Sequence, residues 1–165
     1  MKSKILLLLL LVLPALGIAQ NFELKNPNVA ELKAAMEKTN YTQEPTYLYL
    51  IRNYKIATEK TDIKKYNYPD YTICAFTQRF EHGIVYSEEQ CGETGGITIE
   101  LILPKTERKS LIQWVELIYE SLPMDMEHGW NSNKTKFGPI DDGAGCYFEI
   151  TDTINHTEID LYCGC

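Results

Sequence analysis

The stretch that decides the fold is GCYFEITDTINHTEIDLYCGC, residues 145–165. Apolar and polar side chains alternate on both sides of a polar segment, which is the pattern of two antiparallel strands joined by a turn. One predicted face is apolar and carries sulfur, and the other is acidic and carries tyrosines. The apolar face has Cys146, Phe148, Ile150, Ile159, Leu161, Cys163 and Cys165, and the polar face has Tyr147, Glu149, Thr151, Glu158, Asp160 and Tyr162.

Two registers keep the apolar side chains of this hairpin on one face, because a slip of one residue turns a whole strand over. The first register places Cys146 opposite Cys163. The second, shifted by two residues, places Cys146 opposite Cys165. The first is favoured because a terminal residue tends to fray.

A second hairpin is predicted where two strand-like segments flank the dipeptide 82–83. These segments are 72–80 and 84–91. A two-residue turn that uses the glycine would place Cys74 opposite Cys91. The same turn would put Glu89 on the face of Phe76. A disulfide between these strands would stabilise the fold by about 3 kcal/mol on the loop-entropy model.

Two segments, 28–40 and 106–122, carry apolar residues at helical spacing. The first has two candidate caps, Asn26 and Asn28. Thr106 is the predicted cap of the second helix. Both helices should pack their apolar stripe against the sheet.

Other segments predict further strands. Residues 97–103 alternate cleanly, and 46–57 has apolar side chains on both alternating faces, which indicates a strand buried on both sides. Residues 59–70 form a polar connection, and 124–143 form a loop with a short strand near 134–137. The predicted fold class is α+β, with an antiparallel sheet of about five to seven strands and two helices packed on one face.

The first 19 residues have the organisation of a secretory signal peptide. Lys2 and Lys4 precede the apolar run 5–13, and small residues follow near residue 19. The run is shorter than the ~20 residues of a membrane span. We therefore expect residues 20–165 to form a single secreted or periplasmic domain, with no membrane span after cleavage.

Export would place the five cysteines in an oxidising compartment, where disulfides persist. The two hairpins predict disulfides among Cys74, Cys91, Cys146 and Cys163. An odd count leaves one cysteine, Cys165, without an assigned partner.

The formal net charge is −7, and without Lys2 and Lys4 the 14 remaining basic side chains face 23 acidic ones, a net charge of −9. Nucleic acids and anionic membranes bind through Lys and Arg, so this charge disfavours both as partners. It is compatible with a basic protein partner.

The familiar local motifs of catalysis and cofactor binding are absent, and the sequence predicts no cofactor and no metal. Two alternatives stay open. One is a small secreted hydrolase in which His128 or His82 acts with a nearby carboxylate. The other is a metal or redox protein that uses Cys163 and Cys165.

The leading hypothesis is a binding module that acts by protein–protein contact, with an inhibitor or toxin-neutralising role. Tyrosine offers apolar area and a hydroxyl at low entropic cost, and the chain has 11 tyrosines. The predicted binding residues are those of the outer hairpin face: Tyr147, Glu149, Glu158, Asp160 and Tyr162.

Overall fold

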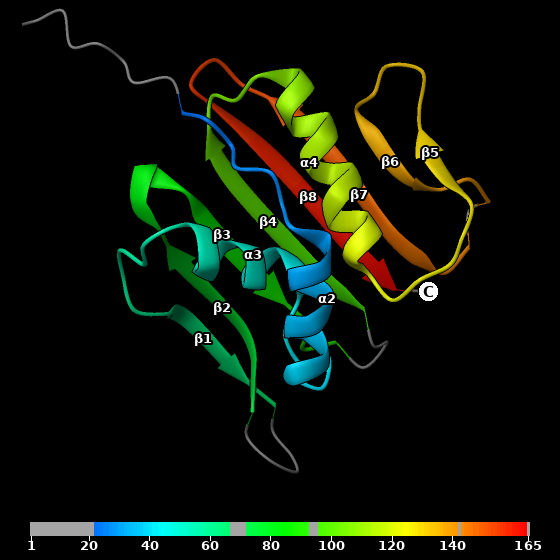
Figure 1. Ribbon diagram of the computed structural model, residues 1–165. Helices are drawn as coiled ribbons and strands as arrows, with labels where there is room; N and C mark the ends of the chain where they lie inside the picture. Colours follow the sequence, from blue (N-terminus) through cyan, green and yellow to red (C-terminus); the bar gives the residue numbers. More distant parts are fainter. Residues whose placement is uncertain (1–21, 67–71, 93–95, 142, 165) are drawn as a thin grey trace, which may run out of the picture.

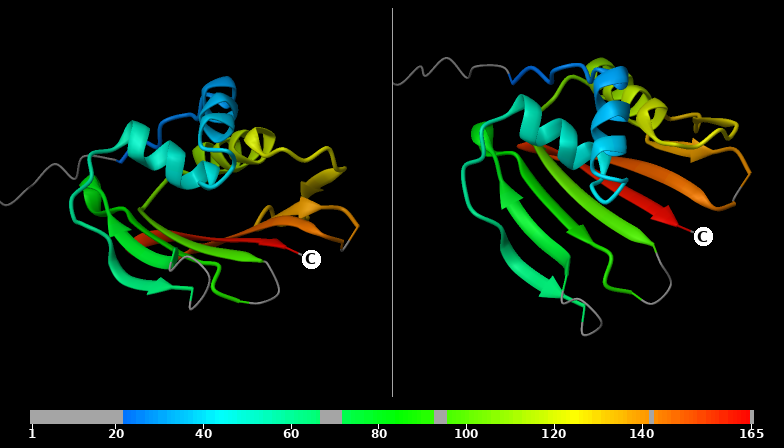
Figure 2. Two further views of the ribbon diagram at one scale, coloured as in Figure 1. Left: turned by 90° about the horizontal axis from the view of Figure 1, so that it is seen from below. Right: turned by 60° about the horizontal axis from the view of Figure 1, so that its bottom comes forward.

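The computed structural model describes residues 22–66, 72–92, 96–141 and 143–164. The expected signal peptide and Cys165 lie outside these residues. The described chain forms one antiparallel sheet of eight strands in the order β1-β2-β3-β4-β8-β7-β6-β5 (Figure 1). The helices lie together on one side of the sheet, and the opposite side is left uncovered (Figure 2).

The strands are β1 (Thr61–Lys65), β2 (Ile73–Arg79), β3 (Val85–Glu89), β4 (Ile97–Pro104), β5 (His128–Trp130), β6 (Lys136–Pro139), β7 (Gly145–Asp152) and β8 (His156–Gly164). The helices are α2 (Val29–Lys38), α3 (Pro45–Asn53) and α4 (Arg108–Ser121), with a single 3-10 turn, η2 (Glu81–Gly83). The α+β class and the antiparallel sheet are as predicted. The described residues form more strands than expected, because β1 lies in the predicted connection 59–70 and β5 in the predicted loop 124–143. They also form one more helix than expected, α3.

The prediction of a strand at 46–57 is wrong, because this segment forms α3. Pro45 occupies its first turn, and the Glu44 carboxylate accepts hydrogen bonds from the first N–H groups. The helix is apolar on most sides because it packs against both the sheet and the other helices, and Tyr49 and Leu50 are fully buried. A short run that is apolar all round carries no period that separates a helix from a strand.

The two predicted helices are present as α2 and α4. Asn28 caps α2 by accepting from the Glu31 N–H (3.2 Å). The predicted cap of α4 is wrong, because the N-cap residue is Glu107 and its side chain makes no capping bond. The Thr106 hydroxyl donates instead to the Pro104 carbonyl oxygen (2.7 Å).

The C-terminal hairpin adopts the first of the two predicted registers. Cys146 lies opposite Cys163, and the two are joined by a disulfide. β8 also pairs with β4 along its length, so this hairpin forms the centre of the sheet. The apolar residues of β7 and β8 face the helices and belong to the core.

The β2–β3 hairpin has a register one residue away from the predicted one. Its turn has three residues, η2, with φ of 62° at His82 and 80° at Gly83. Phe76 therefore lies opposite Glu88, and Glu89 faces the other side of the sheet. The prediction that Glu89 shares the face of Phe76 is wrong.

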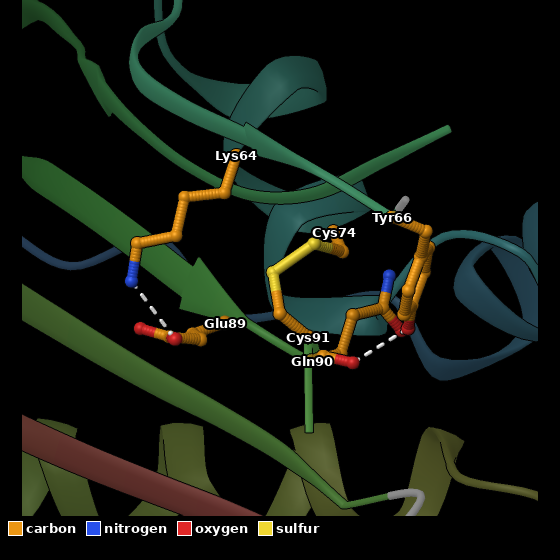
Figure 3. Close-up of a disulfide and its surroundings, with 6 residues drawn as sticks. All are labelled: Lys64, Tyr66, Cys74, Glu89, Gln90 and Cys91. Atoms are coloured by element: carbon orange, nitrogen blue, oxygen red, sulfur yellow. Dashed lines mark hydrogen bonds and ion pairs between the residues drawn. A yellow bond between two sulfur atoms is a disulfide. The ribbon is translucent and has the colours of Figure 1, made fainter. Parts of the chain in front are cut away.

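The longer turn has a tertiary cause. The Glu81 N–H donates to the Lys55 carbonyl oxygen (2.8 Å), which draws this residue out of the β2–β3 ladder. Cys91 then follows the end of β3 and still forms a disulfide with Cys74 (Figure 3). On either side of this disulfide, Lys64 pairs with Glu89, and the Tyr66 hydroxyl donates to the Gln90 carbonyl oxygen.

The core lies between the helices and the covered face of the sheet. Trp114 of α4 packs edge-on against Tyr49 of α3, with ring centroids 5.6 Å apart. A second group of rings, Tyr47, Phe76, Phe80 and Tyr86, joins α3 to β2 and β3. None of the helices in the described residues is long and apolar enough to cross a membrane.

Candidate functional site

The predicted binding residues all lie on the uncovered face of the sheet. Tyr147 pairs directly with Tyr162, and Glu149 pairs with Asp160. Glu158 lies on the same face, two residues before Asp160 along β8. The structure thus brings the five residues together on two neighbouring strands, and their role in binding stays a prediction.

Three carboxylates lie side by side across the centre of this face. Glu100 of β4 is paired with Asp160 of β8, which is paired in turn with Glu149 of β7. We call these residues the acidic row. Like charges directly opposite each other destabilise a sheet, so this arrangement does not serve stability.

A second row runs next to the acidic row, two residues away from it on each strand. Thr98, Tyr162 and Tyr147 are paired in the same way, and we call them the aromatic row. Side chains two residues apart on a strand share a face and lie roughly 7 Å apart. A cationic side chain that contacts a tyrosine ring of one row can therefore reach a carboxylate of the other.

The acidic row is only partly neutralised within the chain. Lys136 of β6 pairs with Glu149 (2.9 Å), at an exposed position where such pairs contribute little to stability. Partial burial, followed by the nearby charges of Glu158 and Glu149, raises the pKa of Asp160. A cation bound beside Asp160 would relieve this repulsion.

A hollow of about 670 Å³ opens at the side of the two rows. Both tyrosines of the aromatic row line it, together with Glu149 and Asp160. Trp130 of β5 also contributes to its lining, but the indole ring lies on the helix side, where it packs on Phe137 and its N–H donates to Glu116 of α4 (2.8 Å). The uncovered face therefore combines aromatic surface, negative charge and a concave shape.

Two glycines make room for the tyrosines of the aromatic row. A Cβ atom on Gly138 would lie 2.7 Å from the Tyr147 ring, and one on Gly164 would lie 2.4 Å from the Tyr162 hydroxyl. The Tyr147 hydroxyl also donates to the Gly143 carbonyl oxygen. The tyrosines are thus held against the backbone.

Two half-buried carboxylates lie on the helix side of the sheet, and the sequence did not predict them as site residues. Glu44 accepts hydrogen bonds from the N–H groups of Thr46 (2.6 Å) and Tyr47 (3.3 Å). Burial raises the pKa of Glu44 to about 8, against the opposite effect of these bonds. Glu88 accepts a hydrogen bond from the Tyr86 hydroxyl (2.6 Å), and burial raises the pKa of Glu88 as well.

The histidines do not form the acid–base pair that a hydrolase needs. His82 is exposed in the η2 turn. The His128 Nδ1 lies 2.7 Å from the Met126 carbonyl oxygen, and its ring packs on Tyr119. Within the described parts of the chain, neither histidine is hydrogen-bonded to a carboxylate, so the geometry gives the hydrolase alternative no support.

The metal or redox alternative needs free thiols at Cys163 and Cys165. The sulfur of Cys163 is bonded to Cys146, and Cys165 lies outside the described residues. Nowhere in the described ranges do three or more His, Cys, Asp or Glu side chains come together in a way that could hold a metal ion.

No family model, curated protein or solved structure matches this chain. Its function must therefore be inferred from the geometry of its own surfaces.

Proposed function

We propose that the protein is a binding module that captures a basic segment of a partner protein on the uncovered face of its sheet. The observation that carries the proposal is the register of the central strands, which sets the acidic row directly beside the aromatic row. An inhibitor or toxin-neutralising role is the form of this activity that we favour, because a small domain of this kind can cover a basic patch on its target.

The two rows suit the two parts of a lysine or arginine side chain. The cationic head can lie over the face of Tyr147 or Tyr162, an interaction of about 0.5–1 kcal/mol at an exposed site. The same head can hydrogen-bond to Asp160, for which the described residues offer no basic partner. An extended segment presents every second side chain to one side, which matches the two-residue spacing between the rows.

The expected setting is consistent with such a role. Two disulfides point to an oxidising environment outside the cytosol. A net charge of −7 would speed the encounter with a basic partner, and high salt would screen this attraction and slow the encounter.

The experiment is a binding titration with a fluorescein-labelled peptide of alternating lysine and threonine, followed by fluorescence anisotropy. We expect binding that weakens as salt rises, because the Debye length falls from about 10 Å at 0.1 M to about 3 Å at 1 M. The triple variant Glu149→Lys, Glu158→Lys, Asp160→Lys should lower the affinity at least tenfold.

The matched control changes the net charge equally at exposed sites away from this face: Glu23→Lys, Glu59→Lys and Glu120→Lys. This control should retain most of the affinity. Equal losses in both triple variants would show that only the net charge matters, and unchanged binding in the first would contradict the proposal outright.

A further inference from the structure

A separate pocket of about 320 Å³ opens on the helix side of the sheet. It lies between the C-terminal end of α2, the start of α3, the segment after α4, the end of β3 and the start of β4. Much of its wall is apolar: Met36, Ile97, Leu122 and Met124 line it, and so does the Cys146–Cys163 disulfide. The pocket can therefore hold a small apolar group.

Two carboxylates, Glu44 and Glu88, line the same pocket. Among the described residues, they are the only acidic or basic side chains that line it. Glu44 caps α3, and Glu88 projects from β3 toward the helices. The wall thus combines apolar surface with two carboxyl groups, and the nearby Lys60 does not line the pocket.

Neighbouring groups outside the pocket wall hold the two carboxyl groups in position. Tyr86 is fully buried and donates to Glu88. The charge of Lys60 opposes the rise in the pKa of Glu88. Its Nζ lies 3.4 Å from the centroid of the Phe76 ring, and burial lowers the pKa of its ammonium group. Within the described residues, Glu44 is hydrogen-bonded to groups at the start of α3, and Glu88 is the charged neighbour that raises its pKa further.

We propose that this pocket binds a small organic cation, namely a protonated primary amine that carries an apolar tail. The ammonium group would donate hydrogen bonds to Glu44 and Glu88, and the tail would pack against Met36 and Met124. Charge complementarity selects this ligand, because an anion would meet two acidic groups, and a purely apolar molecule would cover both without donating to their remaining lone pairs.

Binding should release a proton at neutral pH. With its pKa raised to about 8, the Glu44 carboxyl is largely protonated at pH 7. An ammonium ion beside it favours the carboxylate, so the carboxyl proton passes to the buffer as the complex forms. The affinity should therefore rise from pH 6 to pH 9, while the amine is still protonated. The other titratable groups near the site are Tyr41, Tyr47, Lys60, Tyr86 and Glu88.

The test is isothermal titration calorimetry with hexylammonium chloride, run at pH 7 in two buffers of different ionisation enthalpy. We expect wild-type protein to bind with net proton release. Glu44→Gln and Glu88→Gln should each weaken binding roughly tenfold or more, and Glu44→Gln should abolish the proton release. Glu100→Gln, which alters the uncovered face, is the matched control and should leave hexylammonium binding unchanged.

Hexanol separates the charge from the tail. Equal binding of hexanol and hexylammonium would overturn the proposal, and so would full hexylammonium binding by both glutamine variants. Circular dichroism would show that all variants are folded, and retained binding of the lysine–threonine peptide would show the same for Glu44→Gln and Glu88→Gln. Because the two probes report on opposite faces, failure of this proposal is distinguishable from failure of the proposed function.

Discussion

The two faces of the sheet hold carboxylates under different conditions. On the uncovered face, Glu149 and Asp160 are exposed, and the neighbours of these groups are other carboxylates, tyrosines and Lys136. On the covered face, Glu44 and Glu88 are half-buried beside aromatic rings. Burial beneath the helices thus raises the pKa of Glu44 to about 8 and raises that of Glu88, whereas Glu149 and Asp160 lie open to solvent.

β3 shows this difference within a single pair of neighbours. Glu89 faces the uncovered side and pairs with Lys64 at 2.9 Å, with both side chains well exposed. Glu88 faces the helices, accepts from the Tyr86 hydroxyl, and has a pKa raised by burial. Side chains that are adjacent in sequence therefore have unlike chemistry because they lie on opposite faces.

The largest expected difference between the faces concerns stability, at two adjacent positions of β7. Phe148 is buried in the core, so Phe148→Ala should lower the free energy of unfolding by about 3–5 kcal/mol. Tyr147→Ala should cost about 1 kcal/mol or less, because this side chain lies on the uncovered face. Urea unfolding of both variants measures the difference, and equal losses would contradict the assignment of the faces.

The next largest effect concerns the disulfides. Both close loops of the same sequence separation, 17, so removal of either by a double Cys→Ala change should cost about 3 kcal/mol. Only the Cys146–Cys163 disulfide lines the covered pocket. Its removal should therefore also weaken hexylammonium binding, whereas loss of the Cys74–Cys91 disulfide should not. Thermal unfolding and calorimetry of the two variants give the comparison.

The third effect is the pH dependence of stability that arises from Glu44. Its pKa is about 8 in the folded protein against an ordinary value of 4.5, so the folded state holds the proton more tightly between these values. This contribution to stability is present below about pH 4.5 and is lost as the pH rises through 8. One proton limits the slope to about 1.4 kcal/mol per pH unit.

Glu44→Gln isolates this contribution, because the amide oxygen can still cap α3 and does not titrate. Between pH 5 and pH 8 the wild-type free energy of unfolding should fall more steeply than that of the variant. Parallel curves for the two proteins would show that Glu44 titrates normally.

The uncovered face could be predicted from sequence because it depends on one clear pattern. Alternation in β7 and β8 fixes which side chains share a face, and the opposed Cys146 and Cys163 restrict the register. The acidic row needed one further fact, the pairing of β4 with β8, which no local signal in residues 97–103 indicates.

The covered pocket could not be predicted, for two physical reasons. Glu44 lines the pocket because the segment that follows it is a helix, which Glu44 caps. The sequence of that segment did not indicate a helix, because a run that is buried on most sides shows no helical period. Glu88 faces the pocket because the turn between β2 and β3 has three residues rather than two. We attribute the longer turn to the hydrogen bond between Glu81 and Lys55. Tertiary contacts therefore decided both features.

The most direct test of the central claim is a nuclear magnetic resonance titration of isotope-labelled protein with the lysine–threonine peptide. The proposal predicts that amide and side-chain signals shift along β4, β7 and β8, most strongly near Asp160 and Tyr162, while the signals of α2 and α3 stay in place. Shifts confined to the helices, or none at peptide concentrations that saturate the anisotropy signal, would show that the uncovered face is not the binding surface.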